Sequence, residues 1–169
     1  MSHNLLKGKK GIIFGALNDM SIAWKVAERA HEEGATFTLT NAPIAMRMGA
    51  INELAKKTNT KVIPADATNV DDLKNLFSES QEILGGKVDF VLHSIGMSPN
   101  VRKKKRYTDL NYNWYQQTLD VSAMSLHKLL QVASEMDAIN EWGSVVALTY
   151  IAAQRIFPDY NDMADAKSL

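Results

Sequence analysis

The stretch KKGIIFGALNDMSIAWKVAERAHEEGATFTLT, residues 9–40, is the part of this chain that best predicts its fold. Residues 9–14 form an apolar run of the length and composition typical of a buried strand. Residues 21–33 predict a helix, because apolar side chains recur at a spacing of four from Ile22 onward. Residues 36–40 are rich in residues that favour strands. The stretch therefore predicts a strand, a helix and a second strand in succession.

The same alternation continues along the rest of the chain. Further strands are predicted at 61–65, at 88–93 and from residue 144, and further helices at 46–58, 68–84 and 112–136. Parallel strands need long crossover connections, and an alternation of strands and helices supplies them. We therefore expect residues 1–169 to form a single α/β domain, with a doubly wound, Rossmann-like parallel sheet and helices on both of its faces.

The composition excludes several classes of function. Of the 169 residues, 46% are hydrophobic, and the 19 basic residues balance the 19 acidic ones. A net charge of zero gives no general attraction to nucleic acid or to an anionic membrane. The absence of cysteine excludes disulfides, thiolate metal sites and cysteine nucleophiles. The N-terminus lacks a signal-peptide pattern, and no apolar run has membrane-spanning length. We expect a cytoplasmic protein without nucleic-acid or membrane partners.

Polar and glycine-containing segments follow the predicted strands. They are Gly15–Ser21, Asn41-Ala42, Asp66-Ala67, His93-Ser94-Ile95-Gly96 and Thr149-Tyr150. The carboxyl ends of parallel strands meet at one edge, where ligands bind in such sheets. The glycine-rich dinucleotide fingerprint is absent, but a glycine turn before a helix N-terminus can still receive a pyrophosphate. An ordinary strand-to-helix turn explains this first segment equally well.

Tyr160 and Lys167 are candidate catalytic residues near the end of the chain. Asn161 or Asp162 is expected to cap a helix that runs through Lys167. In that helix the two side chains share a face at an axial separation of about 10 Å, so that an extended cofactor can touch both. A nearby ammonium group lowers the pKa of a phenol. Tyr160 is then a proton donor or oxyanion stabiliser that Lys167 supports; alternatively, the pair is a partly buried aromatic and a solvated charge.

Several motifs together resemble one enzyme family. A Gly-x5-Ser-Ile-Ala turn is present at Gly15 and residues 21–23, and the fourth strand ends in His-Ser-Ile-Gly at residues 93–96. A Tyr-x6-Lys pair, Tyr160 and Lys167, follows an additional tyrosine, Tyr150. In this combination the chain resembles the enoyl-acyl carrier protein reductases of the short-chain dehydrogenase/reductase superfamily. Most of the superfamily uses Tyr-x3-Lys instead.

The resemblance implies hydride transfer from NADH or NADPH to the β-carbon of a trans-2-enoyl thioester carried by acyl carrier protein, in fatty acid biosynthesis. Tyr160 would donate a hydrogen bond to the developing enolate oxygen, and Lys167 would hold the nicotinamide ribose. Tyr150 would line the acyl site. The cofactor-binding set would be Gly15, Ser21 and Ile22 at the pyrophosphate, Asp66 and Ala67 at the adenine, and Ile95 and Gly96 beneath the ribose and nicotinamide. The family usually forms a homotetramer, which we expect here.

The sequence departs from the family pattern at three places. The second strand ends at Asn41 without an acid for a ribose hydroxyl or an adjacent arginine for a 2′-phosphate, and we favour NADH over NADPH. Asp165 introduces a charge where an apolar residue is usual, which puts the packing there in doubt. The chain ends soon after Lys167, whereas family members continue through two further strands and the substrate loop. We therefore expect a fragment that lacks these elements.

Two other features have competing interpretations. Residues 102–106 are all basic and are either a docking patch for an acidic carrier protein or a solvated loop. His93 has no partners at metal-ligand spacing and is interpreted as a structural histidine. Two other functions stay open: a short-chain dehydrogenase acting on a carbonyl substrate, and a catalytically silent nucleotide-binding fragment. No metal site is expected.

Overall fold

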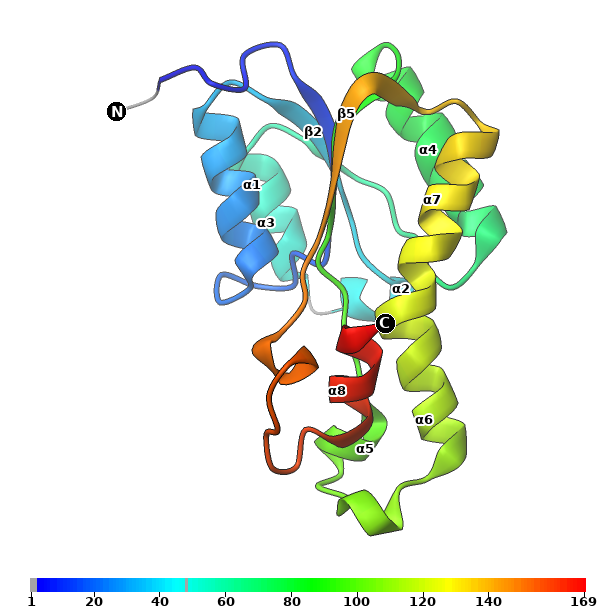
Figure 1. The fold of residues 1–169 in the computed structure, drawn as a ribbon. Helices are drawn as coiled ribbons and strands as arrows, with labels where there is room; N and C mark the ends of the chain where they lie inside the picture. Colours follow the sequence, from blue (N-terminus) through cyan, green and yellow to red (C-terminus); the bar gives the residue numbers. More distant parts are fainter. Residues whose placement is uncertain (1–2, 48) are drawn as a thin grey trace.

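A parallel sheet of five strands forms the centre of the molecule in the computed structural model, which describes residues 3–47 and 49–169 (Figure 1). The strands are β1 (Lys10–Phe14), β2 (Thr36–Thr40), β3 (Lys61–Val62), β4 (Val88–His93) and β5 (Ile139–Ala147). Their order in the sheet is β3-β2-β1-β4-β5, and every neighbouring pair is parallel. The chain starts in the middle of the sheet and extends it first to one edge and then to the other. This topology confirms the predicted doubly wound fold.

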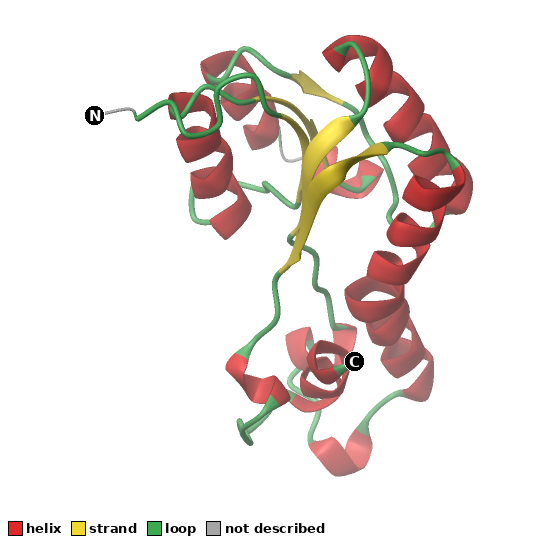
Figure 2. Ribbon diagram, turned by 45° about the horizontal axis from the view of Figure 1, so that its top comes forward, coloured by secondary structure: helices red, strands yellow, loops and turns green. Residues whose placement is uncertain are grey.

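Helices cover both faces of the sheet (Figure 2). They are α1 (Ile22–Glu32), α2 (Pro43–Met46), α3 (Ala50–Lys57), α4 (Val70–Leu84), α5 (Pro99–Arg102), α6 (Tyr112–Leu119), α7 (Ser125–Glu135) and α8 (Asn161–Ser168), with short 3₁₀ turns at Tyr107–Asp109 and Ile151–Ala153. Helices α1 and α3 lie on one face, and α4 and α7 on the other. Helices α5 and α8 lie beyond the carboxyl ends of the strands, beside α6 (Figure 1).

The alternation of side chains along β1 divides the core into two layers. Successive residues of a strand point to opposite faces. Ile12 and Phe14 accordingly pack with the apolar side chains of α4 and α7, while Ile13 packs with those of α1 and α3. All three side chains are at most 1% exposed. Because both faces of this central strand are covered, its buried residues 11–14 form a continuous run without polar side chains rather than an alternating pattern.

The structure corrects four details of the predicted elements, of which the first is the last strand: β5 begins at Ile139 rather than at residue 144. The repeat predicted for helix α1 was Ile22, Val26 and Ala30. Ala30 is buried as predicted, but the helix otherwise buries Ala23 and Ala27 and leaves Ile22 63% exposed, so its buried face lies one residue later over the first two turns. The helix predicted at 46–58 begins only at α3, after Gly49; its Met48 lies outside the described residues. β3 is two residues long instead of five, although main-chain hydrogen bonds to β2 and to the residue after it continue beyond its end.

The helix predicted at 112–136 is present with an irregular centre. α6 and α7 are joined without a break by a π-helical turn at Asp120–Met124. Such turns insert an extra residue into the helix and are frequent at functional sites. Here the turn carries Ser122, whose hydroxyl accepts a hydrogen bond from the N–H of Met97 at 2.9 Å. The segment that follows β4 is thereby attached to the long helix.

Among the described residues, no helix has both the length and the apolar character that a membrane crossing requires.

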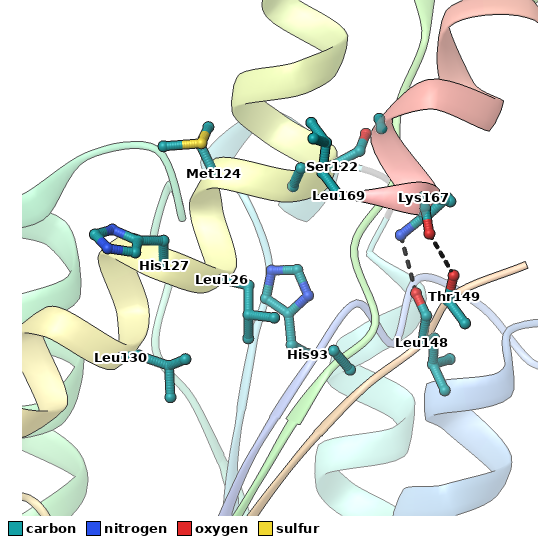
Figure 3. Close-up of a pocket in the computed structure, with 13 residues that line it drawn as sticks. His93, Ser122, Met124, Leu126, His127, Leu130, Leu148, Thr149, Lys167 and Leu169 are labelled. Atoms are coloured by element: carbon teal, nitrogen blue, oxygen red, sulfur yellow. Dashed lines mark hydrogen bonds between the residues drawn. The ribbon is translucent and has the colours of Figure 1, made fainter. Parts of the chain in front are cut away.

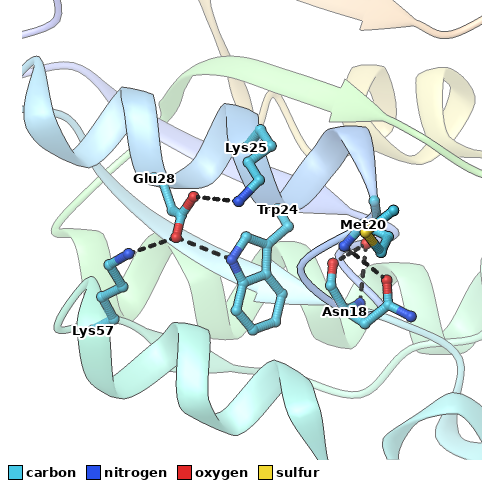
Figure 4. Close-up of polar contacts among 7 residues, drawn as sticks. Asn18, Met20, Trp24, Lys25, Glu28 and Lys57 are labelled. Atoms are coloured by element: carbon cyan, nitrogen blue, oxygen red, sulfur yellow. Dashed lines mark hydrogen bonds and ion pairs between the residues drawn. The ribbon is translucent and has the colours of Figure 1, made fainter.

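A polar cluster ties α1 to α3 on the surface (Figure 4). The carboxylate of Glu28 accepts hydrogen bonds from Lys57 Nζ at 2.6 Å, Trp24 Nε1 at 3.1 Å and Lys25 Nζ at 3.2 Å. These donors, Lys57 above all, lower the pKa of Glu28 from 4.5 to about 2. The ionised carboxylate is therefore favoured in the folded state relative to the unfolded chain.

We predict that Glu28→Gln removes a stabilising contribution that is present only at higher pH. Because the folded-state pKa is depressed, this contribution is complete above about 4.5 and is lost as the pH falls towards about 2. Urea unfolding at pH 6 and pH 2.5 should show the wild type more stable than the variant at the higher pH, with a smaller difference at the lower. Lys57→Met, which removes the strongest donor, should behave in the same way. A difference that does not change with pH would contradict the prediction.

Candidate active site

The turn after β1 brings the ends of two strands into close contact. Gly15 has a φ of +87°, a left-handed conformation that glycine adopts readily. Its N–H donates to the carbonyl of Thr40 at the end of β2. A Cβ atom at this position would lie 1.9 Å from the carbonyl oxygen of Ser94, just beyond β4. Only glycine therefore fits between these two main chains.

The first turn of α1 is organised by Ser21. Its Oγ accepts hydrogen bonds from the N–H groups of Leu17 and Asn18, both at 3.0 Å, and donates to the carbonyl oxygen of Asn18. The hydroxyl is thus engaged inside the loop that connects β1 to α1. The next side chain, Ile22, projects outward and is 63% exposed. The first turn of α1 contains no acidic residue that would occupy the positive end of the helix dipole.

Four of the predicted cofactor-binding residues line one small cavity at the carboxyl ends of the strands. Its volume is about 50 Å³, and its wall includes Gly15, Asp66, Ala67 and Ile95. Asp66 is held in place by its neighbour Thr68, whose N–H and hydroxyl both donate to Oδ1, at 2.9 and 2.8 Å. The structure therefore brings together residues from the turns after β1, β3 and β4.

Lys167 is anchored to two of the strand ends. Its Nζ donates to the carbonyl oxygen of Ile95 at 2.7 Å and to that of Leu148 at 3.0 Å, the second of which Figure 3 shows. A Cβ atom at Gly96 would lie 3.4 Å from the Cε of Lys167, so the lysine passes close to this glycine. Burial lowers the pKa of Lys167 below its usual 10.5. The ammonium group thus lies at the edge of the sheet, beside the turn after β4.

Tyr150 and Tyr160 lie against each other. Their ring centroids are 4.7 Å apart, and the ring centroids of Tyr150 and Phe157 are 5.3 Å apart. Burial, and after it the neighbouring Tyr150, raises the pKa of Tyr160 above 10. The expectation that Lys167 lowers this pKa is wrong for this structure, because its ammonium is directed at two main-chain carbonyls. Tyr160 is therefore a neutral hydrogen-bond donor at neutral pH.

The start of α8 differs from the prediction that Asn161 or Asp162 caps this helix. Tyr160 occupies the position before the helix, and no side chain caps it. Asp162 is fully buried and accepts hydrogen bonds from side chains of other elements instead. Asn161 donates from Nδ2 to the carbonyl oxygen of Lys105 at 2.6 Å. The helix is held by tertiary contacts rather than by a local cap.

Asp165, the unexpected charge in the catalytic motif, has a partner. The hydroxyl of Tyr115 donates to its Oδ2 at 2.6 Å. This bond, more than burial, raises the pKa of Tyr115 to about 12. The doubt about packing at Asp165 is therefore resolved: the carboxylate is paired with a residue of α6.

His93 is a structural histidine, as predicted. It is 1% exposed, and its Nε2 lies 2.8 Å from the Oγ of Ser125. The hydroxyl of Ser125 donates its only proton to the carbonyl of Val121 at 2.7 Å, so Nε2 carries the proton and donates to Ser125. Burial first, and then the charge of Lys167, lowers the pKa of His93 to about 4. The imidazole is neutral at neutral pH.

A second, larger cavity does not contain the tyrosine pair (Figure 3). It has a volume of about 450 Å³ and lies between α7 and the ends of β4 and β5. Lys167 and His93 form part of its wall, which is otherwise mainly apolar, with Leu126, Leu130 and Leu169 among its members. Lys167 thus adjoins this cavity, whereas Tyr150 and Tyr160 lie outside it.

The basic segment is close in space to the start of α8 through the bond from Asn161 to Lys105. Arg102, Lys103 and Lys104 are exposed, and Arg106 forms an ion pair with Asp109 at 2.6 Å. Within residues 3–47 and 49–169, no three acidic, histidine or cysteine side chains are grouped so that they could hold a metal ion.

The arrangement fits a bound dinucleotide. The N-terminus of α1 offers main-chain N–H groups and a positive dipole end to a pyrophosphate, beside the close approach that Gly15 permits. Asp66 and Ala67 lie near one end of the sheet edge formed by the carboxyl ends of the strands, and the Lys167 ammonium group lies near the other end. The sequence did not predict that Lys167 binds main-chain carbonyls or that Asp162 is a buried acceptor of hydrogen bonds from other elements. Neither feature follows from a local sequence pattern.

The chain matches the family model described as "Enoyl-(Acyl carrier protein) reductase" over residues 15–169. It is 35% identical to the enoyl-[acyl-carrier-protein] reductase [NADH] FabI of Rickettsia bellii, a similarity that covers 99% of this chain and 63% of that protein. It therefore spans less than two thirds of the length of this curated relative.

Solved structures show the same similarity. The crystal structure of FabI from Alistipes finegoldii is 65% identical, with a TM-score of 0.97 over 99% of this chain and 64% of that one. A FabI–NADH complex from the same organism has the same identity and TM-score, and the similarity covers 99% of this chain and 59% of that one. The fold described above is thus present in proteins of this family.

Proposed function

Because this chain belongs to the enoyl-(acyl carrier protein) reductase family, we propose that it forms the nucleotide-binding and catalytic domain of an NADH-dependent reductase of trans-2-enoyl-acyl carrier protein thioesters in fatty acid biosynthesis. The observation that carries the proposal is the placement of Lys167 and Tyr160. Lys167 lies among the strand ends that carry Ile95 and Gly96, and Tyr160 lies against Tyr150. This arrangement supplies a cation and a phenol at the edge where a dinucleotide is expected.

Each proposed role follows from the chemistry of the side chain. NADH, when bound, supplies the hydride. Tyr160 donates its hydroxyl proton in a hydrogen bond to the thioester oxygen, where negative charge develops as the double bond is reduced. Its raised pKa keeps that proton on the phenol at neutral pH. Tyr150 packs on the ring of Tyr160, limits its rotation and borders the acyl site.

The cofactor contacts are assigned in the same way. The Lys167 ammonium group has three N–H donors, of which two meet main-chain carbonyls, and the third would donate to a ribose hydroxyl of a dinucleotide lying over Ile95 and Gly96. Gly15, Ser21 and Ile22 form the pyrophosphate turn, and Asp66 and Ala67 border the adenine. Asn41, at the end of β2, brings neither a carboxylate nor a cation to the second ribose, which is compatible with NADH and does not exclude NADPH. We further propose a homotetramer that acts in the cytoplasm.

The proposal is tested by the fluorescence of NADH, and then of NADPH, with the purified chain before and after addition of a short trans-2-enoyl thioester. Binding followed by decay of the signal supports the reductase and identifies the preferred cofactor. Absence of binding contradicts the cofactor site. Binding without oxidation contradicts the activity assigned to residues 1–169 and favours a silent nucleotide-binding domain. Reduction of a ketone but not of the enoyl thioester would favour a short-chain dehydrogenase.

We predict that Tyr160→Phe lowers the turnover of the enoyl thioester about 100-fold, the usual effect of removing one donor to a developing oxyanion. The affinity for NADH should change less than about twofold, because the phenylalanine ring retains the contact with Tyr150. Steady-state kinetics and a fluorescence titration measure the two effects. Tyr112→Phe is the control, since the Tyr112 side chain is 79% exposed and has no role in the proposed site. Equal turnover of Tyr160→Phe and wild type would contradict the role of Tyr160.

A further inference from the structure

Two hydrogen bonds join α6 to α8 in a regular pattern. The hydroxyl of Thr118 lies 2.7 Å from Asp162 Oδ2 and 2.8 Å from the carbonyl oxygen of Trp114, and its single proton is assigned to the carboxylate, the stronger acceptor. The hydroxyl of Tyr115 donates to Asp165 Oδ2 at 2.6 Å. The two donors are three residues apart on α6, and the two carboxylates are three residues apart on α8. Residues at this spacing lie on the same side of a helix. The later donor meets the earlier carboxylate, so the two helices run in opposite directions along this contact. We refer to these four residues as the polar clasp.

Asp162 is the most enclosed member of the polar clasp. Its exposure is 0%, and it also accepts hydrogen bonds from Ser98 Oγ at 2.7 Å and Asn100 Nδ2 at 2.9 Å. All of its hydrogen-bond donors are neutral. Burying a carboxylate is costly unless hydrogen bonds replace the lost water, and here the hydroxyls and the amide replace it. The carboxylate therefore joins α8 to α6 and to the segment that follows β4.

The polar clasp leaves the opposite side of α8 free for Lys167. At about 100° per residue, Lys167 lies about 140° around the helix from Asp162 and about 160° from Asp165. That side is directed toward the strand ends, where the ammonium reaches the carbonyls of Ile95 and Leu148. Tyr160 directly precedes the helix. The rotation of α8 about its axis thus decides where both proposed catalytic side chains lie.

Outside the polar clasp, α8 is held by the hydrogen bonds of Asp162 with Ser98 and Asn100 and by that of Asn161 with the carbonyl oxygen of Lys105. The helix comprises eight residues and has no side-chain cap at its N-terminus. Helices of this length are not stable alone and depend on tertiary contacts. Its buried apolar side chains are Met163, in the first turn of the helix, and Ala166, in the second. Directional hydrogen bonds restrict rotation more strongly than apolar contacts do, because they lose strength when misaligned.

We propose that Asp162 and Asp165 are positioning residues, which Thr118 and Tyr115 hold so that α8 presents Lys167 to the strand ends and Tyr160 to Tyr150. The catalytic consequence rests on the proposed function, whereas the positioning itself does not. Substitutions that remove the hydroxyls of Tyr115 and Thr118 leave Asp162, Asp165 and the catalytic side chains in place. The helix should then be held less tightly, and the affinity for NADH should fall because Lys167 is no longer fixed.

The test uses three variants: Tyr115→Phe, Thr118→Val and the double variant that combines them. Their control is Thr118→Ser, which retains a hydroxyl. Hydrogen exchange of the main chain in residues 160–169 is measured beside that in residues 10–40, together with NADH binding by fluorescence. We expect exchange in α8 to accelerate at least tenfold in the double variant, with residues 10–40 unchanged and NADH bound about tenfold more weakly. Thr118→Ser should match the wild type in both measurements.

Each alternative outcome has a definite meaning. Unchanged exchange in α8 would overturn the proposal, and so would an equal acceleration in residues 10–40, which would assign the polar clasp to general stability. If Thr118→Val fails to fold, Tyr115→Phe alone decides, since Tyr115 is only partly buried. If the wild type does not bind NADH, the proposed function fails, and the exchange comparison still tests the polar clasp.

Discussion

Replacement of Gly15 by alanine is expected to destabilise the fold by about 2–5 kcal/mol, for two additive reasons. The residue has a φ of +87°, where a Cβ atom is strained. In addition, the new methyl group would lie 1.9 Å from the carbonyl oxygen of Ser94. That oxygen belongs to the main chain, so no side-chain rotation relieves the overlap. The ends of β1 and β4 would have to separate.

Gly49→Ala is the matched control for this experiment. Gly49 also has a positive φ, +74°, but among the described residues no atom beyond its own sequence neighbours and helix backbone lies within 4 Å of the position of its Cβ. It therefore reports the conformational strain alone, which we expect to be about 1–2 kcal/mol. Urea unfolding of both variants separates the two contributions. Equal losses in the two proteins would show that the contact with Ser94 is not destabilising. The Gly15 variant should also lose affinity for NADH, because the pyrophosphate turn moves.

Acidification from pH 6.5 to pH 4 is expected to lower the free energy of unfolding by up to about 3 kcal/mol through His93 alone. Its pKa in the folded state is about 4, against 6.5 for the free side chain. The unfolded chain therefore takes up the proton first as the pH falls. Stability from the neutral imidazole is complete above about 6.5 and is lost progressively down to about 4. The physical causes are burial and the nearby charge of Lys167.

His93→Gln tests this prediction, because glutamine retains a donor for Ser125 and does not titrate. The variant should be less stable than the wild type at pH 7.5, and its stability should fall less steeply between pH 6.5 and pH 4. His127→Gln, at an exposed position on α7, controls for the loss of an imidazole as such. The measurement is urea unfolding at four pH values. Parallel pH dependences of the wild type and His93→Gln would contradict the assignment.

Local patterns in the sequence were sufficient for most of the fold. The apolar run before Gly15, the helix predicted at 21–33 and the strand ending at His93 were each predicted correctly, because strand and helix periods are properties of short segments. The errors lie at element ends. At Ile22 the buried face of the helix differs by one residue, since the neighbouring sheet decides which side is covered. Similarly, β3 ends early, since its ladder with β2 comprises only Lys61 and Val62.

The sequence predicted which residues gather at the candidate site but not how their side chains contact one another. The strand-end rule correctly grouped Gly15, Asp66, Ala67 and Ile95, because parallel strands deliver their carboxyl ends to one edge. The roles assigned to these residues, and to Tyr150, Tyr160 and Lys167, stay predictions. The expected lowering of the pKa of Tyr160 was wrong, because it assumed that proximity in a helix implies electrostatic contact. The ammonium instead meets main-chain carbonyls, which no side-chain pattern encodes.

By itself, the sequence determined the alternation of strands and helices, the edge at which the site lies and the residue types present there. These depend on hydrophobic period and on the direction of the strands, both of which act over short stretches of chain. Only the tertiary structure decided the rotation of α8, the pairing of Asp162 with Thr118 and the neutral state of His93. Hydrogen bonds and burial between segments far apart in the chain set these features, since they depend on which groups meet after folding.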